Sequence, residues 1–365
     1  MSLDKVLLVA GARPNFMKVA PIIDCLDEGG IKAVLVHTGQ HYDPLMSDVI
    51  FADLGLRTPD HHLGIGSGSH AVQTARIMEA FEPVLLAEQP DVVIVVGDVN
   101  STMACALVAA KMGVKVAHVE AGLRSRDWSM PEELNRVVTD RVSDFLFAPS
   151  ADAVDNLRQE GYPADRIHLV GNVMVDTLLK HVEAAKRRPT LANLGLEPGA
   201  YGLVTLHRPA NVDDRDRLAS LLGALGQVAE QIPLLYPVHP RARTAVEAIG
   251  LHPKIRLIEP QGYLDFLALE AGARLVLTDS GGIQEETTVL GVPCLTLRET
   301  TERPITVTEG TNRLVGFDPA VITQGARDLP SDHLRPKSPP LWDGTAAVRI
   351  VLILAGATLS DEGVQ

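Results

Sequence analysis

The sequence predicts an α/β protein made of two doubly wound domains in tandem, facing each other across a cleft. Its 365 residues exceed what one ordinary hydrophobic core accommodates. Short β-branched runs alternate with helix-like segments along the chain, a pattern typical of βαβ units and parallel sheets. One central stretch lacks this periodicity and divides the alternation into two series.

The first series predicts strands that are apolar along almost their whole length, as expected for strands buried on both faces of a parallel sheet. These strands are VLLVA (6–10), AVLVH (33–37), DVVIVV (91–96), VKVAHV (114–119), DFLFA (144–148) and a short one at 166–170. Helical patterns lie between or after them at 17–28, 70–88, 101–112, 132–142 and 173–186.

A change in composition at 186–200, where basic residues, proline and glycine occur without periodicity, predicts the linker. We therefore expect a first domain over 1–185 and a second over 198–344, with a final helix in 345–365 packing back on the first domain. The second series of strands is expected at 201–206, 233–238, 255–259, 273–278, 292–297 and 313–317.

Composition excludes several classes of function. The net charge of −13 argues against a broad nucleic-acid surface. The longest apolar runs, such as 91–97, fall well short of the roughly 20 residues that a membrane helix needs. Without a recognisable targeting segment, we expect a cytoplasmic protein. The three cysteines form no CxxC pair and the histidines show no metal-ligand spacing, so no metal is expected.

Two segments can bind an anion. In GARPNFMK (11–18) the first strand runs into a helix, so Arg13 and Lys18 lie beside backbone N–H donors. In TDSGGIQEE (278–286), Ser280 can cap a helix while Gly281 and Gly282 allow a phosphate to approach the backbone. Surface cations near a cap and an ordinary capped helix are the simpler alternatives. Neither segment is a GxGxxG fingerprint or a P-loop, so no nicotinamide cofactor is expected.

Carboxylates follow two of the predicted strands directly. Asp98 ends the run DVVIVVGD, and Glu120 follows VKVAHV. Because ligands of open α/β sheets bind at the carboxyl ends of the strands, both side chains are expected to point into the cleft. Glu132 begins a predicted helix, where complementing the helix dipole is the simpler role. His207 and His239 each follow a strand in the second series.

Together, these segments resemble the non-hydrolysing UDP-N-acetylglucosamine 2-epimerase family. The motifs occur in order from residue 11 to residue 304: GARPNFMKVAP, TGQHYD, PDVVIVVGD, HVEAGLRS, MPEELNR, LHRPANVD, YPVHP, LTDSGGIQEE and RETTERP. The resemblance implies two Rossmann-like domains in the glycosyltransferase-B arrangement, commonly as homodimers. The familiar GTRPE motif reads GARPN here, with Asn15 in place of the acid. Tyr42 and Asp43 depart from the segment that family members activated by their own substrate carry, so such activation is not expected.

The resemblance also implies roles for individual residues on a UDP-linked amino sugar. The diphosphate would be bound by Arg13, His207, Ser280, Gly281 and Gly282, with Arg303 and His239 also on the substrate side. Glu286 resembles the ribose partner, and Phe266 would lie near the uracil. The residues implicated in catalysis would be Lys18, Asp98, Glu120, Glu132 and His207.

The implied reaction explains why several carboxylates are needed. No carbonyl acidifies the C2 proton, so elimination of UDP to a glycal must accompany proton removal. Inversion then requires one group that takes a proton and another that gives one. The alternatives are a hydrolysing epimerase that releases ManNAc and UDP, an epimerase for a diacetamido or uronic-acid sugar, a glycosyltransferase, and a non-enzymatic nucleotide-sugar sensor.

Overall fold

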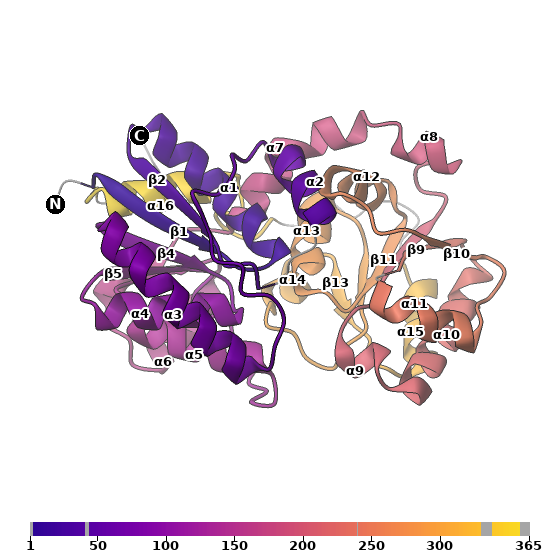
Figure 1. Cartoon of the computed structure of the whole chain (residues 1–365). Coiled ribbons are helices and arrows are strands. Elements are labelled where there is room, and N and C mark those ends of the chain that lie inside the picture. Colours follow the sequence, from indigo (N-terminus) through magenta and orange to yellow (C-terminus); the bar gives the residue numbers. More distant parts are fainter. Residues whose placement is uncertain (1–2, 41–43, 239, 330–337, 358–365) are drawn as a thin grey trace. The chain divides into compact units, whose positions relative to one another are not determined.

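The computed structural model describes residues 3–40, 44–238, 240–329 and 338–357. The chain divides into two compact units, one formed by Met1–Thr177 with Pro340–Gln365 and the other by Leu178–Pro339. Each unit is a parallel sheet covered by helices, which confirms the predicted fold class of two doubly wound α/β domains (Figure 1).

The first unit contains a seven-stranded parallel sheet in the order β3-β2-β1-β4-β5-β6-β7. The strand order reverses direction between β1 and β4, and ligands of such sheets bind at the carboxyl ends of the strands beside this reversal. The strands are β1 (Lys5–Ala10), β2 (Lys32–His37), β3 (His61–His62), β4 (Val92–Val96), β5 (Lys115–Val119), β6 (Phe145–Ala148) and β7 (Ile167–Leu169).

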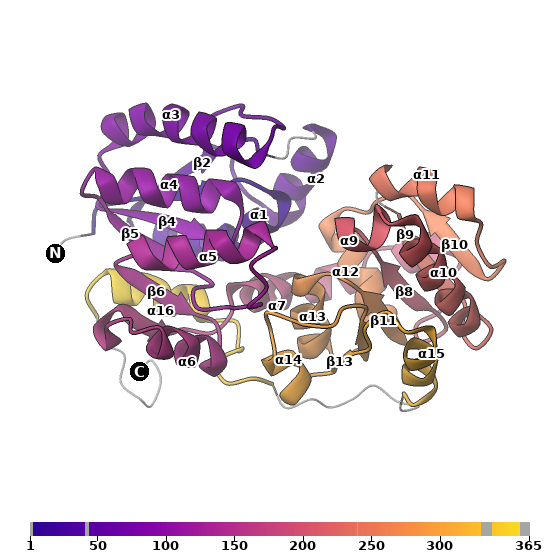
Figure 2. The ribbon, with the colours of Figure 1, turned by 90° about the horizontal axis from the view of Figure 1, so that it is seen from below.

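Helices cover both faces of this sheet. In α3 (His70–Glu88) the buried residues Ile77, Phe81 and Leu85 recur every four positions, which gives the helix one apolar stripe toward the strands. Helices α4 (Asn100–Lys111), α5 (Pro131–Val142) and α6 (Ala151–Gln159) follow α3 in a row on the same face (Figure 2). On the other face, α1 (Arg13–Glu28) packs against α16 (Ala346–Leu354), so the end of the chain returns to the first unit. The remaining elements are α2 (Pro44–Leu54), the 3-10 helix η1 (Ala164–Arg166) and the start of α7 (Val173–Lys186).

The second unit repeats the plan with a six-stranded parallel sheet in the order β10-β9-β8-β11-β12-β13. Its reversal lies between β8 and β11, which pair in parallel. The strands are β8 (Gly202–Thr205), β9 (Leu234–Pro237), β10 (Ile255–Ile258), β11 (Leu275–Thr278), β12 (Cys294–Thr296) and β13 (Asn312–Leu314).

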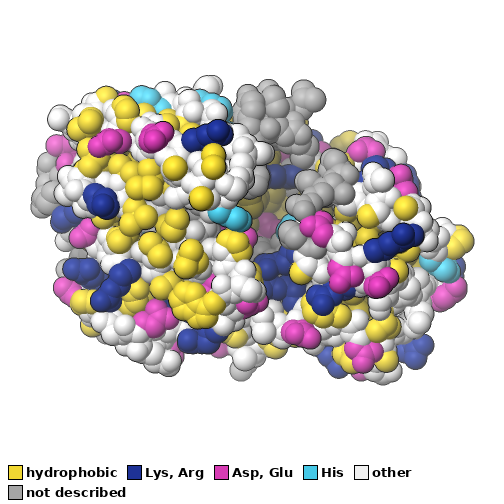
Figure 3. Space-filling view, turned by 60° about the horizontal axis from the view of Figure 1, so that its bottom comes forward, with side chains coloured by type: hydrophobic (Ala, Val, Ile, Leu, Met, Phe, Trp, Pro, Cys, Tyr) yellow, Lys and Arg dark blue, Asp and Glu magenta, His cyan; other side chains and the backbone are white. Residues whose placement is uncertain are grey.

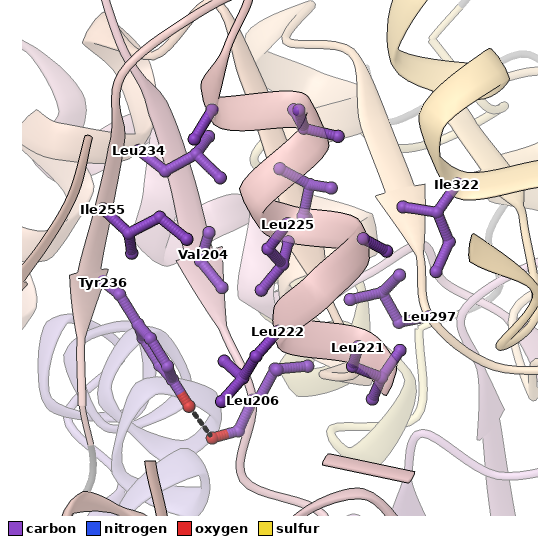
Figure 4. Packing of buried hydrophobic residues seen from close by; sticks show 14 of the residues in the cluster. Val204, Leu206, Leu221, Leu222, Leu225, Leu234, Tyr236, Ile255, Leu297 and Ile322 are labelled. Carbon is purple, nitrogen blue, oxygen red and sulfur yellow. Dashed lines mark hydrogen bonds between the residues drawn. The ribbon is translucent and has the colours of Figure 1, made fainter. Parts of the chain in front are cut away.

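Successive residues of these strands enter opposite cores. Val204 and Tyr236 belong to the core beneath α10 (Arg215–Ala229), to which that helix contributes Leu221 and Leu225 (Figure 4). Leu203 instead belongs to the cluster on the other face. The remaining helices are α8 (Thr190–Leu194), α9 (Pro209–Val212), α11 (Pro240–Ile249), α12 (Tyr263–Gly272), α13 (Gly281–Leu290), α14 (Ile305–Thr308) and α15 (Pro319–Arg327).

The point at which the chain crosses from the first unit to the second differs from the expected linker at 186–200. The chain passes from one unit to the other within α7, at Thr177 and Leu178. Segment 186–200 contains α8, whose Leu191 and Leu194 pack against the core of the second unit. Proline and glycine there mark the ends of a short helix rather than a free connection. Within the described residues, no helix is long and apolar enough to cross a membrane.

Candidate active site

In the first unit, the residues of the GARPNFMK segment form a tight turn between β1 and α1. Asn15 is 2% exposed, and its Oδ1 accepts hydrogen bonds from the backbone N–H groups of Gly11 (3.0 Å) and Ala12 (2.9 Å). Its Nδ2 donates to the carbonyl oxygen of Val96 at 3.2 Å, at the end of β4. The amide therefore ties together the two strands at the reversal, which requires an acceptor and a donor in one side chain.

Lys18 and Glu120 form a buried ion pair above this turn. Both are 7% exposed, and Lys18 Nζ contacts Glu120 Oε2. Glu120 adopts a left-handed φ of +75°, uncommon for a residue with a side chain and a frequent feature of functional sites. Gly97 leaves room for the pair, because a Cβ there would lie 2.9 Å from Lys18 Nζ.

Asp98 is held by a second cation, Arg136, that sequence reasoning did not single out. Arg136 Nη2 contacts Asp98 Oδ2, and its Nη1 lies 3.2 Å from Glu133 Oε2. The guanidinium is 4% exposed and the Asp98 side chain 24% exposed, so the cation is buried while the carboxylate reaches solvent. Asn135 Nδ2 also donates to the Asp98 carbonyl oxygen at 2.8 Å.

The two glutamates at the start of α5 have different environments. Glu132, the predicted catalytic candidate, is exposed on the first turn of the helix. Glu133 is buried, and accepts hydrogen bonds from the backbone N–H groups of Ser125 (2.8 Å) and Arg126 (2.9 Å). Glu133 therefore fixes the loop that follows Glu120. Asp98 and Glu120 follow the neighbouring strands β4 and β5, and Lys18 of α1 contacts Glu120. Glu132 lies at the surface.

A buried network behind these residues connects the ends of β4 and β5. His118 Nδ1 lies 2.6 Å from Asp140 Oδ1, and His118 Nε2 lies 2.8 Å from the Gly97 carbonyl oxygen. The other oxygen of Asp140 accepts from Gly122 N at 3.1 Å and pairs with Arg124 at 2.7 Å. Burial alone would raise the pKa of Asp140, but His118 and Arg124 outweigh it and the pKa is lowered.

In the second unit, the TDSGG segment forms the start of α13 directly after β11. Ser280 occupies the N-cap position, but its hydroxyl makes no cap hydrogen bond, so the predicted side-chain cap is wrong. The backbone supplies the turn instead, because Ser280 N donates to Thr278 Oγ1 at 2.9 Å. A Cβ at Gly281 would lie 2.5 Å from Arg303 Nη1, so this cation lies against the first turn of α13. A helix N-terminus beside an arginine is a suitable anion site.

Arg303 is itself held in a buried group of charges. Its Nε lies 2.8 Å from Glu285 Oε1, and the guanidinium is 8% exposed. Glu302, which is buried, accepts two hydrogen bonds from Arg298 at 2.9 and 2.8 Å. Arg208 Nη2 lies 3.4 Å from the same carboxylate. The RETTERP motif therefore supplies cations whose positions are fixed before any ligand binds.

At the end of β8, His207 lies beside the carboxylate of Asp279. His207 Nδ1 is 2.8 Å from Asp279 Oδ1, with the imidazole 52% exposed and the carboxylate completely buried. The two residues follow neighbouring strands, since Thr205 is paired with Thr278. The second unit thus has its histidine–aspartate pair at its strand reversal, the position that Asn15 and Gly97 occupy in the first.

The other predicted substrate-binding residues vary in their surroundings. Glu286 is buried, and its Oε1 accepts from Tyr263 Oη at 3.3 Å. Phe266 is half-buried on α12, and Arg13 is half-buried as the first residue of α1. Gly282 is the second residue of α13. His239 lies outside the described residues.

Arg136 and Asp279 both belong to motifs of the sequence, MPEELNR and LTDSGGIQEE, but no role was predicted for either residue. Arg136 lies four residues after Glu132 in MPEELNR, but this spacing alone does not say which residues of the helix face the sheet. Asp279 directly follows a strand in LTDSGG, as Asp98 does in VVGD. The position after a strand at the reversal was therefore a usable signal for Asp279.

The chemistry available differs between the units. The first offers two carboxylates, Asp98 and Glu120, each beside a cation. Such a pair suits the removal of a proton from a substrate atom and its return. The second offers cations, a helix N-terminus and a histidine, which suits a diphosphate. Among the described residues, no group of three or more His, Cys, Asp or Glu side chains is arranged to hold a metal ion.

Comparison with known proteins gives matches over almost the whole chain. Residues 24–355 match the protein family described as UDP-N-acetylglucosamine 2-epimerase. The chain is 42% identical over 361 residues to the UDP-N-acetylglucosamine 2-epimerase of Methanocaldococcus jannaschii, covering 96% of this chain and 98% of that protein. It is 41% identical over 355 residues to the UDP-2,3-diacetamido-2,3-dideoxy-D-glucuronate 2-epimerase of Pseudomonas aeruginosa, covering 96% and 99%.

A solved structure shows the same fold. The crystal structure of the Methanocaldococcus jannaschii UDP-GlcNAc 2-epimerase in complex with UDP-GlcNAc and UDP superposes with a TM-score of 0.90 at 41% identity. The superposition covers 97% of this chain and 100% of that chain.

Proposed function

Because the chain belongs to the UDP-N-acetylglucosamine 2-epimerase family, we propose that it interconverts UDP-N-acetylglucosamine and UDP-N-acetylmannosamine without hydrolysis. The observation that carries this proposal is the pair of carboxylates, Asp98 and Glu120, at the ends of adjacent strands. Val96 of β4 pairs with Val119 of β5, so the two acids come just after paired ends of adjacent strands. Each is held by its own cation, Arg136 or Lys18.

The reaction needs these groups because C2 of the sugar is not acidic by itself. When the bond between C1 and the diphosphate oxygen breaks, its electron pair leaves with UDP, and positive character at C1 acidifies the C2 proton. One carboxylate accepts that proton, and a C1=C2 double bond forms. Addition of UDP back to C1, with a proton delivered to the opposite face of C2, gives the epimer. One base and one acid are therefore required.

The second unit would bind UDP. Ser280, Gly281 and Gly282 would present backbone N–H groups to the diphosphate, beside Arg303 and His207. Arg13 and His239 would add further donors, Glu286 would bind the ribose hydroxyls, and Phe266 would lie near the uracil. Donors of this kind stabilise charge on a departing oxygen, and each is typically worth about 3 kcal/mol.

Incubation with UDP-GlcNAc in D2O, followed by NMR at C2, tests the proposal. Formation of UDP-ManNAc with deuterium at C2 of both sugars supports it. Unchanged substrate with tight UDP binding would overturn it, and free ManNAc with UDP would show a hydrolysing enzyme. The same spectra resolve the three outcomes, because the anomeric signal differs between a UDP-linked and a free sugar.

A second candidate substrate is a UDP-linked diacetamido uronic acid. The Pseudomonas aeruginosa relative named for that sugar is 41% identical, and the Methanocaldococcus jannaschii relative is 42% identical. Identity therefore does not separate the two substrates. Parallel reactions with both UDP-sugars would separate them, and the larger kcat/KM identifies the substrate.

We also propose that the protein is a homodimer, formed through an apolar face on the first unit. Hydrophobic side chains gather on the part of the surface formed by that unit (Figure 3). Val72 of α3 and Leu134 of α5 are exposed, and Met103 and Leu107 on the intervening α4 are half-exposed. A contiguous apolar patch of this kind is typical of a protein interface. Leu107→Glu should convert a dimer into a monomer in sedimentation velocity; a wild-type monomer would overturn the proposal.

A further inference from the structure

Asp279 is a buried carboxylate to which the family resemblance assigned no role. It is 0% exposed and follows β11 directly. Its Oδ2 accepts from the backbone N–H of Arg208 and from Asn211 Nδ2, both at 3.0 Å. The backbone N–H of His207 lies 3.2 and 3.1 Å from its two oxygens. With these donors in place, Oδ1 is directed at Nδ1 of the His207 imidazole.

We propose that Asp279 is the positioning residue of His207: it keeps a proton on Nδ1 and thereby directs Nε2 toward the oxygen that leaves with UDP. The proposal rests on the proposed epimerase function. The geometry supports it because the buried carboxylate holds the Nδ1 side of the ring while the imidazole is 52% exposed. A second anchor holds the preceding residue, since Tyr236 Oη donates to the Leu206 carbonyl oxygen at 3.1 Å (Figure 4).

Asp279 must be ionised to have this effect. Burial by itself would raise its pKa, but His207, Arg208 and Asn211 together lower it. An ionised carboxylate has only acceptors, so the imidazole nitrogen facing it must carry the proton. Nε2 is then the nitrogen that exchanges a proton elsewhere. An aspartate orients the histidine of hydrolase triads through the same pair of atoms.

In the elimination, the His207–Asp279 pair would supply a proton to the leaving group. As the bond between C1 and the β-phosphate oxygen breaks, its electrons remain on that oxygen, and the Nε2 proton of an imidazolium transfers to it. The C2 proton moves to a carboxylate of the first unit at the same stage. One proton is gained and one is lost by the protein, and re-addition of UDP reverses both transfers. Asp279 remains an anion throughout and compensates the imidazolium charge.

Asp279→Asn tests the inference with little change of shape. The donors around Oδ2 should retain the amide oxygen there, so the amide NH2 would face His207 Nδ1 and force it to accept. The Nδ1 proton would then be lost. We expect kcat to fall by about 10²-fold or more, the usual contribution of proton transfer, with the Kd for UDP close to that of the wild type. Asp318→Asn is the matched control, because that aspartate caps α15 by accepting from Ala320 N at 2.8 Å and has no part in the proposed site.

A double variant distinguishes positioning from a general structural effect. If Asp279 acts through His207, adding Asp279→Asn to His207→Gln should reduce kcat no further than His207→Gln alone. A multiplicative loss in the double variant, or a normal kcat in Asp279→Asn, would overturn the inference. A loss of UDP binding equal to the loss of kcat would also overturn it.

NMR of the ring nitrogens tests the wild type, in case Asp279→Asn does not fold. The protein contains 12 histidines, and the His207 signals are those missing from His207→Gln. We expect a proton on Nδ1 in the protein saturated with UDP; a neutral ring protonated only at Nε2 would overturn the inference. This result is independent of turnover. If the wild type fails to epimerise UDP-GlcNAc, the proposed function falls while the tautomer still reports on Asp279.

Discussion

A role of Asp98 and Glu120 in proton transfer can be separated from a role in binding by replacing each carboxylate with its amide. Asp98→Asn and Glu120→Gln keep the shape but remove the proton-accepting oxygen, so each should lower kcat by at least about 10²-fold. Calorimetric titration should show UDP bound with near wild-type affinity, because the proposed UDP site lies in the other unit. Asp91→Asn is the control, since that aspartate accepts from Asp4 N and Lys5 N at the opposite end of the sheet. Normal kcat in both variants would reject the assignment.

The asparagine that replaces the family's glutamate gives a second test at the level of one residue. Asn15→Asp keeps the acceptor for Gly11 and Ala12 but puts a carboxylate oxygen against the Val96 carbonyl oxygen. Because the site is 2% exposed, the unfolding free energy should fall by about 1–3 kcal/mol. Urea denaturation followed by tryptophan fluorescence measures it, since Trp128 and Trp342 both lie in the first unit. An unchanged midpoint would show that the amide donor is dispensable.

Single residues were predicted from the sequence where a strand end and a charged side chain coincide. Asp98, Glu120 and His207 met that condition, and each lies at the end of a strand. Arg136, which holds Asp98, and Glu133, which holds the 125–126 loop, could not be found in this way. Their roles depend on which face of α5 turns toward the sheet, and the start of this helix is polar on more than one face, with Glu132 exposed and Glu133 buried. Sequence order alone does not choose between Glu132 and Glu133.

At the scale of elements, the return of the chain to the first unit depends on Asp176. Its carboxylate accepts from Ala346 N (3.2 Å) and Ala347 N (2.7 Å), the first N–H groups of α16. Asp176→Ala leaves these donors without their acceptor, a loss of about 1 kcal/mol for a helix start. Hydrogen exchange of the 346–354 amides should accelerate, while the amides of α4 keep their protection. Equal acceleration in both helices would indicate a global effect instead.

The strands were predicted more completely than the helices. Five of the six strands of the second unit fall inside the predicted ranges, and β13 begins one residue before its range, at Asn312. Apolar runs bounded by glycine or proline are a strong signal for buried parallel strands. The two-residue β3 at His61–His62 was missed, because it is held by pairing with β2 rather than by its own composition. Helix α8 was missed for a related reason: its leucines pack only because the second unit supplies a core for them.

At the scale of the whole molecule, the strand order explains how unrelated motifs become one site in each unit. In both sheets the reversal separates the first strand of the unit from the fourth, β1 from β4 and β8 from β11. The ends of those strands are 86 residues apart in the first unit (Ala10 to Val96) and 73 in the second (Thr205 to Thr278), yet they lie side by side. Periodicity predicts the strands, but only the topology makes neighbours of Asn15 and Val96, or of His207 and Asp279.

The pH dependence of stability should differ between the units because of Glu270. Glu270 is completely buried on α12, and burial together with the charge of Glu286 raises its pKa well above 4.5. In the unfolded chain this carboxyl ionises near 4.5, while in the folded chain it keeps its proton to higher pH. Folding is therefore opposed increasingly as pH rises through this window, by about 1.4 kcal/mol for each pH unit.

Glu270→Gln should remove that penalty, because the amide resembles the protonated acid and does not titrate. The gain in unfolding free energy should be small at pH 5 and larger at pH 7. Far-ultraviolet circular dichroism follows both units during denaturation, whereas tryptophan fluorescence follows only the first. The shift should thus appear in the ellipticity transition and leave the fluorescence transition in place if the units unfold separately. A gain of the same size at every pH would mean that Glu270 is ionised in the folded protein.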